Sequence, residues 1–278
     1  MKLPLLFVPA ALAALCACTS QPNDSPADAG PPNAFGDGLS IRDVMDPNLP
    51  TAAANGAVVA ITGVAYSWLD TYDETHDGKS VGTVYVQDAQ SSLAYSGASL
   101  YEPSYSPASL RLSPGDIIDM PTATYVADSA LSTVTFAPGQ YLIQLSEPII
   151  TFRFDAFEPI APTVINLTDL NDFNLGDQWL GMVVTINNVT FQSNLENADG
   201  RVTAYLTTTD AGIQGGTVEL ANELFDIATW NGTTADAGGG GGVIALGHTI
   251  TSLTGIVTWF EGYQIAPRYP ADIGPLAE

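Results

Sequence analysis

Cysteine is nearly absent from this chain of 278 residues, which has two, Cys16 and Cys18, both close to the N-terminus. Because no cysteine follows Cys18, the rest of the chain contains no disulfide framework. The two cysteines are separated by one residue and are badly spaced for bridging each other. Histidine is equally scarce, and His76 and His248 do not have the spacing of paired metal ligands. We therefore expect no zinc site and no cofactor.

Basic residues are also few. The chain has 7 Lys and Arg against 30 Asp and Glu, which gives a formal net charge of −23 at pH 7. Nucleic-acid binding depends largely on Lys and Arg that neutralise phosphates, and a strongly acidic protein repels polyanions. We therefore do not expect nucleic acid as a partner. The basic residues beyond the N-terminal segment are scattered along the chain: Arg42, Lys79, Arg111, Arg153, Arg201 and Arg268.

A membrane-spanning run is missing as well, because the apolar stretch from Leu3 to Leu15 is shorter than the roughly 20 residues that a span requires. One charge, a short apolar run and small residues are typical of a signal peptide, which we expect at residues 1–17. The segment Leu15-Cys16-Ala17-Cys18 resembles the lipobox of bacterial lipoproteins. This resemblance implies lipidation of Cys18, with processing at Cys16 or ordinary secretion as the alternatives.

The residues after Cys18 indicate the membrane to which the protein is attached and the kind of segment that links the lipid to the folded part. Asp is absent from position 19, where Thr19 stands, which by resemblance to lipoprotein sorting rules implies a cell-envelope protein of the outer membrane, facing the periplasm or the surface. Residues 18–40 are rich in Pro, Ser, Asp, Ala and Gly and cannot bury enough apolar surface to order themselves. We expect the lipidated Cys18 followed by a disordered tether.

Helical periodicity is hard to find in the remaining chain, where short runs rich in Val, Ile, Thr and Tyr alternate with turn residues. This pattern is typical of an all-β protein. The predicted strands form two sets: Val58–Ala65, Val81–Gln87, Ala98–Tyr101, Ile117–Val126 and Tyr141–Leu145, then Met182–Phe191, Val202–Thr207, Thr217–Leu220, Thr249–Trp259 and Tyr263–Pro267.

The two sets look like one module used twice. Gly56–Val64 matches Gly181–Val189, and the Tyr85 and Tyr205 strands follow the Asp-Gly turns at residues 77–78 and 199–200. Five strands with a long first strand and a hairpin have the layout of an OB-fold, a small Greek-key barrel. We predict two tandem OB-fold-like five-stranded barrels, at residues 41–152 and 177–278, joined by a connector at 153–176 that adds one helical turn at 167–170. A helix is expected at 221–229.

Three segments carry a further resemblance: Gly82–Asp88, Tyr95–Tyr101 and Leu112–Ile118. Together they are similar to an exported OB-fold region that precedes the catalytic part of extracellular nucleases and also occurs in uncharacterised surface lipoproteins. The resemblance implies the fold of most of residues 40–275. It does not imply hydrolysis, because no catalytic domain follows.

Motifs for catalysis or metal binding are scarce. The sequence has no phosphate-binding P-loop and no Gly-x-Ser-x-Gly elbow. Asp73, Thr75 and Asp77 imitate the start of a calcium loop, but Val84 stands where the closing Glu belongs. An exposed hairpin loop with an Asp-Gly turn is the favoured alternative.

Strand alternation suggests where a ligand would bind. OB-folds generally bind ligands across their second and third strands, so Tyr85, Tyr101 and Tyr205 are the candidate ligand-face residues, with ordinary cross-strand packing as the alternative. Trp68, Trp259 and Phe260 either plug barrel ends or mark a ligand mouth.

These observations lead to one main functional hypothesis and two alternatives. The main hypothesis is a non-enzymatic, lipid-anchored binding or scaffold protein with a protein, glycan or small-molecule partner. The first alternative is an accessory protein in extracellular nucleic-acid processing, which the nuclease resemblance implies. The second is a hydrolase with an unrecognised site.

Overall fold

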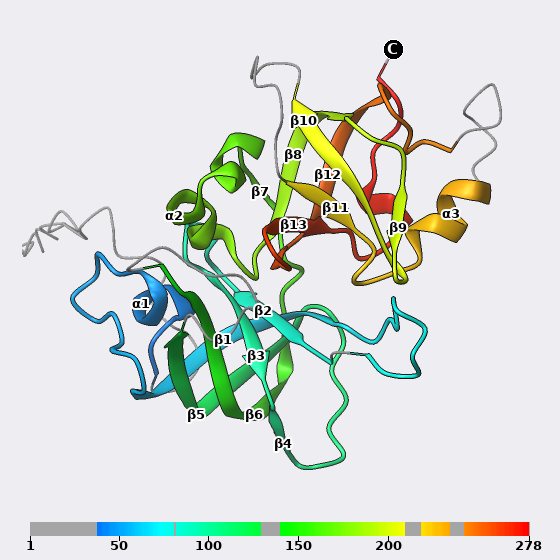
Figure 1. Cartoon of the computed structure of the whole chain (residues 1–278). Coiled ribbons are helices and arrows are strands. Elements are labelled where there is room, and N and C mark those ends of the chain that lie inside the picture. The colour runs from blue at the N-terminus through cyan, green and yellow to red at the C-terminus, as the bar shows by residue number, and fades with distance from the viewer. Residues whose placement is uncertain (1–37, 81, 129–139, 209–217, 234–241, 278) are drawn as a thin grey trace, which may run out of the picture. The chain divides into compact units, whose positions relative to one another are not determined.

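The computed structural model describes residues 38–80, 82–128, 140–208, 218–233 and 242–277 (Figure 1). The predicted signal peptide, Cys18 and nearly all of the tether lie outside these residues. All of these described residues belong to one compact unit. Within the described residues, no helix combines the length and the apolar character needed to cross a membrane.

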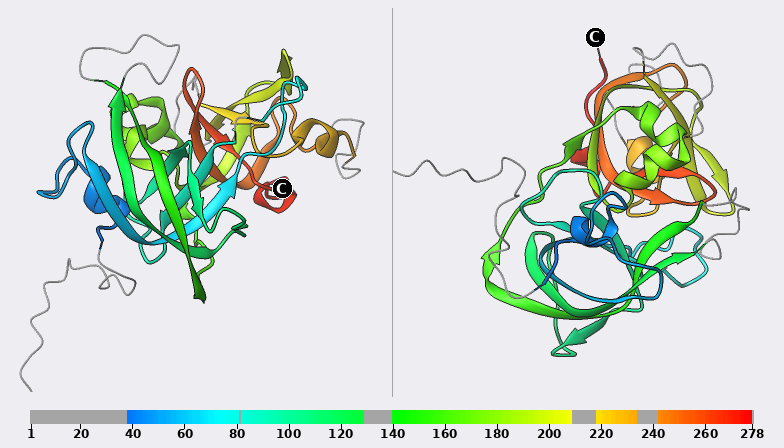
Figure 2. Two further views of the ribbon diagram at one scale, coloured as in Figure 1. Left: turned by 90° about the horizontal axis from the view of Figure 1, so that it is seen from below. Right: turned by 90° about the vertical axis from the view of Figure 1, so that its left-hand side faces the viewer.

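The first module is a six-stranded sheet with a short helix, α1 (Ile41–Met45), packed against β1, β2 and β3 (Figures 1 and 2). The strand order is β3-β2-β1-β5-β6-β4, and a parallel pairing of β3 with β6 links the two arms of the sheet. The strands are β1 (Val58–Leu69), β2 (Val84–Asp88), β3 (Gly97–Tyr101), β4 (Ser104–Ser106), β5 (Asp116–Asp128) and β6 (Leu142–Phe157).

The second module contains a closed five-stranded barrel in a seven-stranded sheet. The order β7-β8-β12-β13-β11-β10-β9 closes through the pairing of β8 with β10, and β11 runs parallel to β13. The strands are β7 (Thr163–Val164), β8 (Val183–Phe191), β9 (Glu196–Ala198), β10 (Arg201–Thr208), β11 (Glu219–Ala221), β12 (Thr249–Trp259) and β13 (Tyr263–Ala266). The helices are α2 (Phe173–Gly176), α3 (Ile227–Thr233) and the 3-10 turns η2 (Leu167–Asn171), η3 (Asp177–Trp179) and η4 (Pro270–Asp272).

Each module has its own apolar core. Period-two alternation places every second residue of a strand inside, so that Val84 and Val86 lie in the first core, while Val202, Ala204 and Leu206 lie in the second. The residues between them, Tyr85 and Tyr205, point outward from their modules. A third cluster, containing Tyr85 and Leu224, lies where the two modules meet.

The contact between the modules includes close approach of backbones. A Cβ at Gly181 would lie 2.7 Å from the carbonyl carbon of Ala98, and a Cβ at Gly200 would lie 2.4 Å from the carbonyl oxygen of Glu74. The backbone N–H of Val183 donates to the Gln87 side-chain oxygen at 3.0 Å, in a buried setting.

The all-β prediction is confirmed, and several boundaries differ from the sequence-based ones. Strand β6 continues to Phe157, past the predicted module end at residue 152, because it pairs with β5 as far as Asp116. The predicted helix at 221–229 begins only at Ile227. Ala221 still belongs to β11, and just beyond it the Asn222 side-chain oxygen accepts from the Val202 N–H at 2.9 Å while the Asn222 backbone N–H donates to the Val202 carbonyl at 3.1 Å.

Candidate functional site

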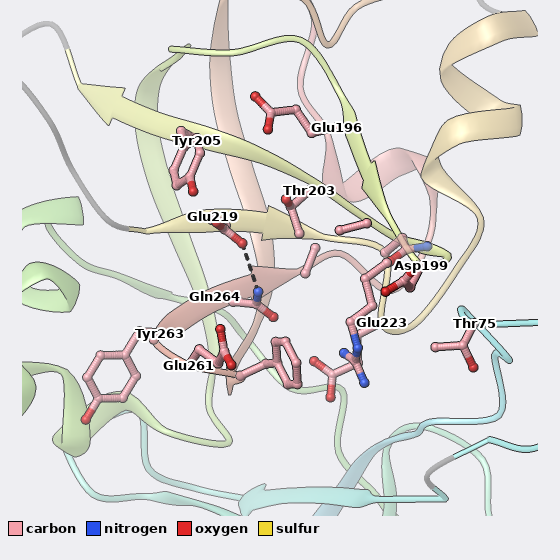
Figure 3. A pocket seen from close by; sticks show the side chains of 16 residues that line it. Thr75, Glu196, Asp199, Thr203, Tyr205, Glu219, Glu223, Glu261, Tyr263 and Gln264 are labelled. Carbon is pink, nitrogen blue, oxygen red and sulfur yellow. Dashed lines mark hydrogen bonds between the residues drawn. The ribbon is translucent and has the colours of Figure 1, made fainter. Parts of the chain in front are cut away.

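A pocket of about 680 Å³ lies on the outer face of the barrel in the second module (Figure 3). Strands β9, β10, β11 and β13 form its floor, and the turn between β12 and β13 forms one wall. Thr75 reaches it from the first module. The residues that line it are Thr75, Glu196, Ala198, Asp199, Arg201, Thr203, Tyr205, Glu219, Ala221, Asn222, Glu223, Phe260, Glu261, Gly262, Tyr263 and Gln264.

Strand alternation positions the floor of the pocket. Along β10, the core residues are separated by Arg201, Thr203 and Tyr205, which all line the pocket. Glu219 on β11 is the cross-strand partner of Tyr205, and Gln264 on β13 pairs with Glu219 in turn. The Gln264 amide donates to a Glu219 carboxylate oxygen at 3.1 Å.

Carboxylates dominate the charge of the pocket. Glu196, Asp199, Glu219, Glu223 and Glu261 line it, whereas Arg201 is the only basic residue among the described lining residues. Their effect extends to Tyr205, because the negative charge of Glu219 and its hydrogen bond with the phenol raise the pKa of Tyr205 above its usual value. The pocket is therefore electronegative.

Arg201 connects the two modules at one end of the pocket. Its guanidinium forms an ion pair with Glu74 of the first module at 2.8 Å. The same guanidinium lies over the Phe260 ring, 4.0 Å from the ring centroid, which is a favourable cation–π geometry. Because Glu74 is 3% exposed, this ion pair lies at the buried edge of the pocket.

A second hollow of about 490 Å³ continues the first toward the first module. It shares Arg201, Glu223 and Phe260 with the pocket, and its walls include Tyr85, Tyr101 and Trp259. We call the two hollows together the intermodule groove. One wall of the groove comes from β2, β3 and β6, and the other from the second barrel.

Buried carboxyl groups lie beside the groove. Asp70 is fully buried, and its carboxylate oxygens have no hydrogen-bond partner from a side chain in the described parts of the chain. Burial, together with the nearby Glu223 and Glu74 carboxylates, raises the pKa of Asp70 to about 7. Burial also raises the pKa of Glu223, and the Tyr85 hydroxyl donates to Glu223 at 2.8 Å.

The three predicted ligand-face tyrosines lie in different surroundings. Tyr85 is 4% exposed, because the second module covers it. Tyr101 is 53% exposed and lines the hollow next to the first module, and Tyr205 is 40% exposed in the pocket. Tyr85 and Tyr101 therefore line the smaller hollow of the groove, and Tyr205 lines the larger one. Only Tyr101 and Tyr205 are accessible to a ligand.

The aromatic residues at the strand ends are of two kinds, one exposed in the groove and two packed against other rings. Phe260 is 42% exposed and lines both hollows, so it lies at the mouth of the groove. Trp259 packs edge-on against Phe173 and Tyr263, with ring centroids 5.3 and 4.7 Å away. Trp68 lies 5.9 Å from the ring of Tyr269 and against the cluster between the modules.

The loop with calcium-like spacing is closed by its own hydrogen bonds. The Asp73 carboxylate accepts from the backbone N–H groups of Asp77 at 3.2 Å and Gly78 at 2.7 Å, and from the Thr75 hydroxyl at 3.5 Å. This geometry is typical of an Asx-stabilised turn. Across the described residues, no three His, Cys, Asp or Glu side chains are grouped closely enough to hold a metal ion.

Sequence reasoning missed most of the acidic lining. Alternation in β10 was a usable signal for Arg201 and Thr203, since both share the face of Tyr205. No local pattern indicated Glu219 or Glu223, because their place in the pocket depends on the pairing of β11 with β10 and β13.

Comparison of the chain with protein-family models, with curated proteins and with solved structures finds no match. The geometry of the groove is therefore the basis for assigning a function.

Proposed function

We propose that this protein is a lipid-anchored, non-enzymatic binding protein of the cell envelope, made of two tandem OB-fold modules that bind a ligand in the intermodule groove. The lipid is expected on Cys18, and residues 18–40 would hold the modules away from an outer membrane. The observation that carries the binding role is the groove itself, with exposed Tyr205 and Phe260 on its walls.

The topology supports the OB-fold assignment. In the first module β1, β2, β3, β6 and β5 pair in a cyclic order, and in the second module β8, β10, β11, β13 and β12 pair in the same order. Counted in chain order, the third and fifth strands of each cycle, β3 and β6 in the first module and β11 and β13 in the second, run parallel. Helix α3 lies between the third and fourth strands of the second cycle, the usual place for the short helix of this fold.

The position of the groove supports binding. OB-folds use the outer face of their second and third strands for ligands, which in the second module are β10 and β11. Binding sites commonly combine exposed aromatic surface with a few fixed polar groups. Tyr205 and Phe260 supply the former, and Glu219 and Gln264, held by their mutual hydrogen bond, supply the latter.

The nucleic-acid alternative has less support. Single-strand binding uses aromatic platforms in a basic groove, and this groove has five carboxylates in its larger hollow for one guanidinium. A phosphate backbone would be repelled there.

Site-specific photo-crosslinking in intact envelopes tests the binding role. A photoreactive phenylalanine analogue at position 205 should give discrete crosslinked products, whereas the same analogue at Ile149, 41% exposed on β6 and not among the described lining residues, should give none. Equal labelling from both positions, or none from 205, would refute the groove as the binding site. Metabolic labelling with radioactive palmitate tests the anchor, since Cys18→Ala should abolish incorporation.

A further inference from the structure

The groove has a strong imbalance of charge on an accessible surface. Glu196 on β9, Asp199 in the following turn and Glu261 in the β12–β13 turn are all exposed and belong to separate segments that converge on the pocket. No ion pair joins any of these three carboxylates to a basic residue of the described chain. A ligand that brings positive charge would therefore meet uncompensated negative charge from several sides.

Arg201 indicates the chemistry that suits this surface. Its guanidinium is held by a carboxylate of Glu74 and by the face of Phe260, so that a cation already occupies the junction of the two hollows, at one end of the larger pocket. Tyr205 and Glu219 repeat the combination of an aromatic face and a carboxylate farther along the floor. Here no basic side chain of the described chain fills the position, since Arg201 is the only base in the lining.

The size and continuity of the groove indicate a chain rather than a small ion. The two hollows of about 680 and 490 Å³ meet at Arg201, Glu223 and Phe260, which gives room for several successive side chains. An extended peptide places side chains alternately on its two sides, so one side can present cations to separated carboxylates. Metal binding would instead need three or more clustered ligands, which the described residues do not provide.

We propose that the intermodule groove binds an extended, Lys- and Arg-rich segment of a partner protein. This inference rests on the proposed binding function and specifies its ligand. The ammonium and guanidinium groups of the segment would pair with Glu196, Glu219 and Glu261 and lie against Tyr205. Binding would weaken with added salt, because Glu196 and Glu261 are exposed and their charges are screened.

The test uses the purified full chain and a fluorescent peptide in which Lys and Arg alternate with Ser, with fluorescence anisotropy as the readout. The variant Glu196→Gln/Glu261→Gln removes two exposed carboxylates from the pocket. The loss of each exposed charge pair should weaken binding by about threefold, so we expect about a tenfold increase in Kd for the double variant. Thermal unfolding should show that the variant remains folded.

A matched control separates groove recognition from the general acidity of the protein. Glu147→Gln/Glu158→Gln removes the same charge from two exposed glutamates that are absent from the described lining. Glu147 also matches Glu261 in backbone conformation, with φ of 52° against 58°. We expect less than about a twofold change in Kd for this control, since distant exposed charges are screened.

Several outcomes would overturn the proposal. Equal loss of affinity in both double variants would indicate a general acidic field, and displacement of the peptide by spermine or Mg²⁺ at equal charge concentration would indicate small-cation binding. Binding of a neutral glycan in place of the peptide would change the ligand class. Crosslinking from position 205 without peptide binding at low salt would refute the basic-peptide proposal and leave the proposed binding function intact. If neither crosslinking nor peptide binding is observed, the binding function and the peptide proposal are both refuted.

Discussion

The same strand position carries a tyrosine in both modules, and the two tyrosines have opposite surroundings. Tyr85 on β2 is 4% exposed and donates a hydrogen bond to Glu223 of the second module, whereas Tyr205 on β10 is 40% exposed beside Glu219. In the first module this face forms the contact between modules. In the second module it remains open, so duplication of a strand pattern does not duplicate its use.

This difference explains how one groove results from two similar modules. The covered face of the first module supplies a buried wall through Tyr85 and the cluster around Leu224. The open face of the second supplies accessible aromatic and acidic groups.

The largest effect is expected at Tyr85, with Tyr205 as its comparison. Tyr85→Ala removes a buried aromatic ring and the hydrogen bond to Glu223, so we expect the free energy of unfolding to fall by about 3–5 kcal/mol. Tyr205→Ala should change it by less than about 0.5 kcal/mol, as for most surface substitutions. Urea denaturation of both variants measures the contrast; similar losses would contradict the assignment of one covered and one open face.

A pH effect is expected from Asp70, which lies beside the covered face. An unfolded Asp ionises near its usual pKa of 3.8, whereas folded Asp70 keeps its proton up to about pH 7. Its contribution to stability is therefore fully present below about pH 4 and is lost as pH rises to about 7.

Asp70→Asn removes this ionisation, so the variant should lose less stability than the wild type between pH 4 and pH 7 and should be the more stable of the two at pH 8. Asp88 and Asp177, with pKa values raised by burial to about 7 and about 6, would leave a residual pH dependence. Unfolding curves measured across this range provide the check. Parallel pH profiles for the two proteins would show that Asp70 does not titrate as described.

The backbone contact between modules can be tested with two glycines of similar conformation. Gly181 has φ of 78° and Gly56 has φ of 82°, but only a Cβ at Gly181 would meet another residue, the backbone of Ala98. Both alanine variants carry the cost of a left-handed residue, about 1–2 kcal/mol. Gly181→Ala should lose a further 1–3 kcal/mol, about the cost of overpacking. Equal melting temperatures for the two variants would argue against the close contact.

A smaller loss of stability than at Tyr85 or Gly181 is expected at Phe260. Phe260→Leu removes the ring under the Arg201 guanidinium and keeps an apolar side chain, so stability should fall by about 0.5–1 kcal/mol. Calorimetric unfolding can resolve this change. An effect as large as that of Tyr85→Ala would place Phe260 in the packing between modules rather than at an open mouth.

Much of the fold could be predicted from local pattern. The strand expected at Thr249–Trp259 matches β12, and the helical turn expected at 167–170 falls within η2. Alternation also placed Tyr85 and Tyr205 outside their cores correctly. These features depend on neighbouring residues, so the sequence contains enough information to predict them.

The groove could not be predicted in the same way. The hydrogen bond from Tyr85 to Glu223 joins residues 138 positions apart, and no local pattern indicates which outward face another module will cover. The acidic lining depends likewise on strand pairing between β10, β11 and β13. The predicted lipidation at Cys18 stays a prediction, as do the roles of Asp73, Thr75 and Asp77.

Mapping the binding surface by backbone amide NMR, with the Lys- and Arg-rich peptide added to the labelled full chain, tests the central claim most directly. The account predicts chemical-shift changes concentrated on β9, β10 and β11 and at Phe260, and strongly reduced in Glu196→Gln/Glu261→Gln. Changes centred on Val58 or Leu246, which are 70% and 62% exposed outside the described lining of the groove, would contradict it.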